Sequence, residues 1–112
     1  MLKHPKIINT QNLTSDSVIM TLFIPASIIF FQGHFDGMPI LPGVAQVDWA
    51  IFFACKFLHL EINKGICIDQ IKFNKIIKPD STIFLALEIK KNILHFKYYN
   101  DSSICSSGKI KT

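Results

Sequence analysis

The chain has 112 residues, of which 49% are apolar and 18% are charged, and its net charge is +4. This length fits a single domain, residues 1–112. The positive charge comes from scattered lysines without any arginine, so we expect no nucleic-acid partner. This share of apolar residues is high for so short a chain. It predicts that one element of secondary structure is almost completely buried and that a subunit interface covers part of the surface.

The first third of the chain predicts one strand followed by a fixed loop. Residues 1–16 are polar and mixed, with only a possible short strand at Ile7 and Ile8, and the N-terminus is therefore interpreted as short and poor in strands. Residues 17–25 are rich in β-branched side chains and predict a strand that ends at a proline. After a connection at 26–31, residues 32–43 contain three glycines and two prolines, which excludes regular helix or central strand.

A long apolar helix follows this loop. Pro42 suits the first turn, and residues 44–59 continue without a breaker and are apolar on nearly every face. This pattern predicts a helix buried all round, with its end near 63–65 and Gly65 as a left-handed cap.

Four strand-like runs complete the chain, at 66–77, 82–89, 93–99 and 104–110. The breaks between them read KPDS, KKN and NDSS, which favour turns and antiparallel neighbours. One buried helix and an antiparallel sheet curled around it give an α+β architecture.

The cysteines and the apolar runs indicate the compartment. Cys55, Cys67 and Cys105 are odd in number, match no zinc spacing and follow no signal peptide, so we expect buried free thiols in a reducing compartment. Pro25 interrupts the longest apolar run, so no membrane span is expected and the chain is predicted to be cytoplasmic.

Two residues of the loop and helix carry the chemistry. His34 lies in the glycine-proline loop, and its side chain is a natural base at physiological pH. Asp48 lies in the apolar helix, where we expect burial to favour a neutral carboxyl that can act as an acid. Gly43 adds a backbone N–H at the positive end of the helix, suited to an oxyanion. These parts suit removal of a proton α to a thioester carbonyl and expulsion of a β-hydroxyl.

The run Gly33-His34-Phe35-Asp36-Gly37-Met38-Pro39-Ile40-Leu41-Pro42-Gly43, followed by Asp48, resembles the signature GHFPGxPxxPGxxxxE/D. That signature belongs to the 3-hydroxyacyl-(acyl carrier protein) dehydratases of the hot-dog fold. The segment LPGVAQVDWA at 41–50 looks most like the aryl-polyene-type branch of that family.

The resemblance implies a hot-dog fold and a set of roles. His34 would abstract the α-proton, and Asp48 would handle the departing hydroxyl. Gly43 would hold the thioester carbonyl, Ile40 would orient the histidine through its C=O, and Phe35 would contact the substrate.

The resemblance also implies partners. The substrate would arrive on the phosphopantetheine arm of an acyl carrier protein, and no metal or cofactor would be used. The chain would form a homodimer or a higher homo-oligomer, with the histidine and the acid of one site on different subunits.

Two positions depart from the family pattern: Asp36 replaces the usual proline, and Asp48 stands where one large branch has glutamate. Two other functions stay open. A hot-dog thioesterase would use a carboxylate and water to release free thiol. A non-catalytic acyl-binding subunit would bind acyl thioesters without changing them, and the short N-terminus and Asp36 leave room for it.

Other polar residues have simpler interpretations. Gln46 points about 200° away from Asp48 around the helix, so we interpret it as structural or as part of a dimer seam. Trp49, Phe52 and Phe53 are interpreted as core, and His4, His59 and His95 as incidental. Lys72, Lys75 and Lys78 would suit either an acidic carrier protein or a solvated strand edge.

Overall fold

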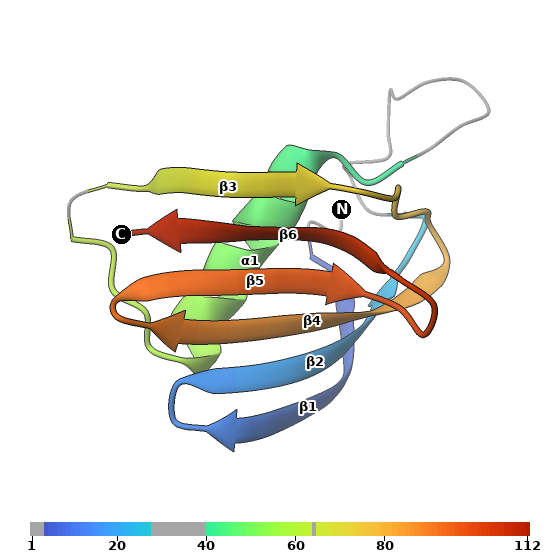
Figure 1. The fold of residues 1–112 in the computed structure, drawn as a ribbon. Helices are drawn as coiled ribbons and strands as arrows, with labels where there is room; N and C mark the ends of the chain where they lie inside the picture. Colours follow the sequence, from blue (N-terminus) through green and yellow to red (C-terminus); the bar gives the residue numbers. More distant parts are fainter. Residues whose placement is uncertain (1–3, 28–39, 64) are drawn as a thin grey trace.

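The computed structural model describes residues 4–27, 40–63 and 65–112. These residues form six strands and one helix: β1 (Lys6–Thr14), β2 (Ser17–Ile24), α1 (Gly43–Phe57), β3 (Cys67–Phe73), β4 (Ser81–Lys90), β5 (Ile93–Tyr99) and β6 (Ile104–Lys111). The helix lies against one face of a single sheet (Figure 1), which is the predicted α+β architecture. In the described residues, no helix is long and apolar enough to cross a membrane.

The strands pair in the order β1-β2-β4-β5-β6-β3, and every pair is antiparallel. β1 and β3 are therefore the two edges of the sheet, as Figure 1 shows. Alternate residues of the central strands face the helix; in β4 these are Ile83, Leu85 and Leu87. One cluster of buried apolar side chains fills the space between sheet and helix.

The N-terminus contains more strand than expected. β1 has nine residues and pairs with β2 from Lys6↔Phe23 to Thr14↔Ser17, although its burial pattern is largely exposed. The expectation of a short, strand-poor N-terminus was wrong because an edge strand with one solvated face needs little apolar sequence. The register shifts in this pair blur the alternation further.

The position of β3 was also predicted wrongly, because β3 pairs with β6 and not with β4. Residues 74–77, assigned to a strand from sequence, leave the sheet and cross to β4. The N–H groups of Asn74 and Lys75 both donate to the carbonyl of Cys105, at 2.8 and 3.0 Å. Ile77 is buried, so the apolar character of the crossing comes from packing and not from strand pairing.

The helix ends earlier than predicted. Phe57 is its last residue and Leu58 its C-cap, and His59 follows in the left-handed region with φ 57°. Gly65 does have a positive φ, 94°, but it lies well beyond the helix and does not cap it. The predicted helix was too long because Leu58 and Leu60 continue its apolar pattern. These two residues pack on the core from outside the helix.

Candidate active site

The start of α1 presents backbone donors. Pro42 is the N-cap, and the N–H groups of Ala45 and Gln46 donate to its carbonyl at 3.1 and 3.2 Å. Proline supplies no side-chain cap, and the N–H groups of Gly43 and Val44 precede the first bond of the helical ladder. These donors, at the positive end of the helix dipole, suit an oxygen that carries negative charge.

Gly43 is packed against an aromatic ring from the edge of the sheet. A Cβ built on Gly43 would lie 2.6 Å from Cζ of Phe73, the last residue of β3. Any side chain at this position would therefore displace the ring. Phe73 itself is 54% exposed, so its ring lines the surface beside the helix start.

Asp48 lies on the opposite side of α1 from the sheet, where it is exposed. Its neighbours one turn away are exposed too, with Val44 at 76% and Phe52 at 40%. The expectations of a helix buried all round and of a buried Asp48 were wrong for the single chain. A sheet on one side covers only the face that carries Trp49 and Phe53.

The helix face that carries Asp48 has a neighbour that the sequence did not reveal. The ring of His4 stacks on Phe52, one turn after Asp48, with 4.1 Å between ring centroids and 17° between ring planes. His4 was interpreted as incidental, and no motif links it to the helix. Only the path of the chain before β1 places it there.

The other site residues divide into described and undescribed ones. Ile40 is half-buried directly before Leu41, whose N–H donates to the carbonyl of Ile77 at 2.8 Å. His34 and Phe35, like Asp36, lie outside the described residues. The pairing of His34 with Asp48 therefore stays a prediction.

Gln46 is structural, as one of its two interpretations proposed. Its side chain is 3% exposed and its amide is bonded to the carbonyl of Leu41 and to Ser106. Trp49 and Phe53 are core residues as predicted, whereas Phe52 is only partly covered. Cys105 is buried and its burial raises the pKa of its thiol, but Cys67 is exposed at the edge of the sheet, against expectation.

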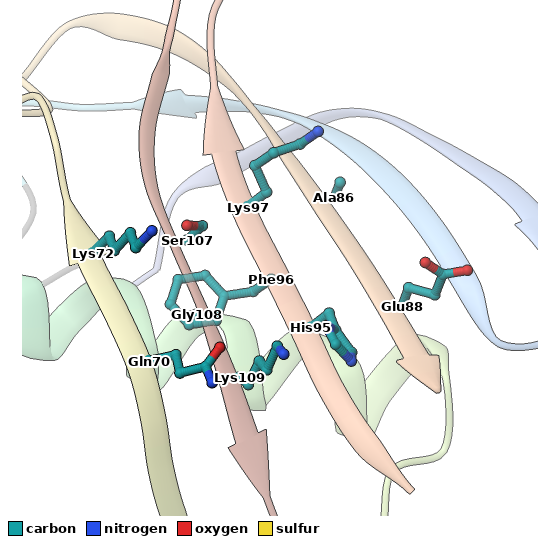
Figure 2. A pocket seen from close by; sticks show the side chains of 10 residues that line it. All are labelled: Gln70, Lys72, Ala86, Glu88, His95, Phe96, Lys97, Ser107, Gly108 and Lys109. Atoms are coloured by element: carbon teal, nitrogen blue, oxygen red, sulfur yellow. The ribbon is translucent and has the colours of Figure 1, made fainter. Parts of the chain in front are cut away.

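A separate hollow of about 380 Å³ lies on the face of the sheet that points away from α1 (Figure 2). Lys72, Lys97 and Lys109 reach it from β3, β5 and β6, so pairing gathers lysines that are scattered in the sequence. His95 lines it as well, and partial burial together with Lys109 and Lys90 lowers the pKa of that imidazole. The sheet separates this hollow from Asp48, so it is not part of the candidate site.

Comparison with known proteins points to one family. Residues 10–109 match the family model described as ApeI-like, ApeI dehydratase. Among solved structures, the dehydratase heterocomplex ApeI:P from Xenorhabdus doucetiae contains a chain that is 31% identical, with a TM-score of 0.86 and 96% coverage of both chains. An uncharacterised protein from Erwinia carotovora subsp. atroseptica is 33% identical, with a TM-score of 0.77 over 96% of this chain and 94% of that one.

The matches to curated relatives cover a smaller share of each protein. The 3-hydroxyacyl-(acyl carrier protein) dehydratase FabZ of Acetivibrio thermocellus is 36% identical over 93 residues, which cover 73% of this chain and 64% of the relative. For the FabZ proteins of Buchnera aphidicola and Lactiplantibacillus plantarum the matched shares of the relative are 60% and 56%, so the match spans less than two thirds of each. The family model covers most of this chain, and the chain belongs to the ApeI-like dehydratase family with the hot-dog fold expected from its sequence.

Proposed function

We propose that this protein dehydrates 3-hydroxyacyl thioesters, carried on acyl carrier protein, to trans-2-enoyl thioesters in fatty acid or polyene lipid biosynthesis. The observation that carries the proposal is the start of α1. It offers helix-terminal N–H groups that no described residue accepts a bond from, and a carboxyl within the same short stretch, inside the region that matches the dehydratase family. The FabZ relatives are named as dehydratases of acyl-carrier-protein substrates, which supports the choice of substrate.

The proposed mechanism assigns one task to each group. The imidazole of His34 removes the α-proton, and the electron pair of that C–H bond forms the new Cα–Cβ double bond. The β-carbon–oxygen bond breaks as the carboxyl of Asp48 gives its proton to the hydroxyl, which leaves as water. The N–H of Gly43 donates to the thioester oxygen while negative charge develops on it. Ile40 is assigned to orient His34 through its carbonyl, and Phe35 to contact the acyl chain.

We further propose that the working form is a homodimer in the cytoplasm. Within the described residues, the edge strand β3 pairs with a strand on one side only. Val44 and Phe52 leave apolar surface exposed beside Asp48, and Phe73 is exposed at the helix start. A second copy seated on this surface would cover it and would remove Asp48 from water. Such burial favours the neutral carboxyl that the mechanism needs. The second copy would also supply His34 to the site, as the family resemblance implies.

The test is an assay of the purified protein with short and medium 3-hydroxyacyl thioesters, on carrier protein and on coenzyme A. Enoyl-thioester absorbance and free thiol are followed together for the wild type, His34→Ala and Asp48→Asn. We expect enoyl product from the wild type on carrier protein. Each variant should lose on the order of a hundredfold or more in kcat, since each removes a proton-transfer group.

The other outcomes identify the competing functions. Release of free thiol without enoyl product would make the protein a thioesterase. Binding of acyl thioesters with no change in either signal, by a folded dimer, would make it a non-catalytic acyl-binding subunit. Enoyl formation that persists in Asp48→Asn would remove Asp48 from the proposed mechanism.

A further inference from the structure

A buried network of hydrogen bonds joins the first turns of α1 to the sheet. Ser106 donates from Oγ to Oε1 of Gln46 at 2.6 Å, and Nε2 of Gln46 donates to the carbonyl of Leu41 at 3.2 Å. Gln46 is 3% exposed and Ser106 is fully buried. Each polar atom of the Gln46 side chain therefore has a partner from a different part of the chain.

A third residue completes the network from the neighbouring strand. The hydroxyl of Tyr98 donates to the backbone carbonyl of Gln46 at 2.8 Å. Tyr98 and Ser106 are register partners on β5 and β6, so two adjacent side chains of the sheet hold one helical residue. Burial, followed by the charge of Asp48, raises the pKa of Tyr98 well above its ordinary value, so the phenol stays protonated and remains a donor.

A glutamine at this position is costly unless it is fully bonded. It lies between the buried residues Ala45 and Val47, in a helix whose inner face is otherwise apolar. An apolar residue would avoid the desolvation of an amide, whereas a satisfied buried network fixes one arrangement of its elements. The network thus sets how α1 sits on the sheet, beyond what apolar packing alone would do.

Leu41, whose carbonyl accepts the hydrogen bond from Gln46, lies directly before the candidate site. Leu41 has its N–H bonded to Ile77 and its carbonyl bonded to Gln46, so it is held on both sides. Gly43 lies between Leu41 and Gln46, and Asp48 lies two residues after Gln46. Gln46 points into the core while Asp48 is exposed, so the glutamine does not reach a substrate beside Asp48.

We propose that Gln46 is a positioning residue, which with Ser106 and Tyr98 fixes the helix start so that the N–H of Gly43 and the carboxyl of Asp48 meet the substrate correctly. The proposal rests on the proposed dehydratase function. Its effect passes through the bond from Gln46 to Leu41. Loss of that bond should slow the chemical step, because small errors in the placement of reacting groups lower kcat strongly.

The test compares Gln46→Met, Ser106→Ala and the double variant with Leu94→Ala, a core variant on β5 outside the network. Gln46→Met leaves Ser106 and the carbonyl of Leu41 unpaired, whereas the double variant leaves only Leu41 unpaired. The double variant should therefore regain thermal stability relative to Gln46→Met. We expect kcat to fall about tenfold to a hundredfold in Gln46→Met and in the double variant, with KM changed less than about threefold. Leu94→Ala should lose stability but keep kcat at 25 °C.

A second measurement does not depend on activity. In ¹H–¹⁵N spectra the amide signal of Gly43 should shift in Gln46→Met and in the double variant, and stay in place in Leu94→Ala. A kcat that recovers with stability in the double variant would show that the network is only structural and would overturn the proposal, as would an unmoved Gly43 signal. An inactive wild type with the expected Gly43 shifts would instead overturn the proposed function and leave the network as a device that fixes the helix start.

Discussion

The two faces of α1 differ in how completely the rest of the chain buries their side chains and pairs their polar atoms. The inner face carries Trp49 and Phe53 in the core and Gln46 with every side-chain polar atom bonded. The outer face leaves Val44 76% exposed and leaves Asp48 exposed beside it. The inner face is thus complete within one chain, whereas the outer face is apolar surface with a carboxyl in its midst. The difference indicates that stability resides on one face and the proposed chemistry on the other.

The largest effect on stability should come from the inner face. Trp49→Ala removes a fully buried side chain and should lower the free energy of unfolding by about 3–5 kcal/mol. Phe52→Ala, on the outer face, should cost clearly less. Urea denaturation followed by circular dichroism, at two protein concentrations to separate unfolding from dissociation, measures both variants. Equal losses would contradict the division between the two faces.

The contact between Gly43 and Phe73 gives a smaller effect at the boundary of the faces. Gly43→Ala should destabilise the protein by no more than about 1 kcal/mol, because the new Cβ overlaps only the far end of the exposed Phe73 ring, which has to shift. Phe73→Ala should tolerate the added methyl, so the double variant should lose less than the sum of the two single variants. A coupling energy of about 0.5–1 kcal/mol, at the lower end of the range for residues in contact, is expected from the mutant cycle. Additive losses would mean that the ring moves aside freely.

On the outer face, Val44→Lys should change the unfolding free energy of the single chain by no more than about 0.5 kcal/mol. It should nevertheless weaken self-association, because a charge enters the apolar surface of the proposed dimer. Sedimentation velocity across a dilution series measures this. Gln11→Lys adds the same charge on β1, at the other edge of the sheet, and should leave the association unchanged. Identical behaviour of both variants would place the interface elsewhere.

The smallest effect concerns His95, on the face of the sheet that points away from α1 (Figure 2). Its pKa lies below the ordinary value of 6.5 because of partial burial and the nearby charges of Lys109 and Lys90. The unfolded chain therefore takes up this proton more readily than the folded one, so the contribution to stability falls as the pH drops through 6.5. NMR titration of the imidazole should show the lowered pKa, and Lys109→Gln should raise it. An unchanged pKa in that variant would exclude the influence of Lys109.

Much of the fold followed from local sequence. The strands at 17–24, 93–99 and 104–111 and the start of the helix at 43 were predicted within a residue or two, since their apolar periods and breakers are clear. Gly43 and Asp48 could be proposed as site residues from sequence because the motif that contains them is contiguous, and their roles stay a prediction. Strand β1 was missed because a half-solvated edge strand carries a weak pattern. The pairing of β3 with β6 was missed because its closest partner in sequence is not its partner in space.

Periodicity, turn residues and motifs are local properties, so the helix, most of the strands and the run of residues that carries the proposed chemistry can be predicted from the sequence. Four features appear only once the chain is folded: which helix face stays open, the contact of Phe73 with Gly43, the stacking of His4 on Phe52 and the bonds of Tyr98 and Ser106 to Gln46. These contacts join residues far apart in the chain. They depend on strand order and on the side of the helix that meets the sheet, and no local pattern encodes either.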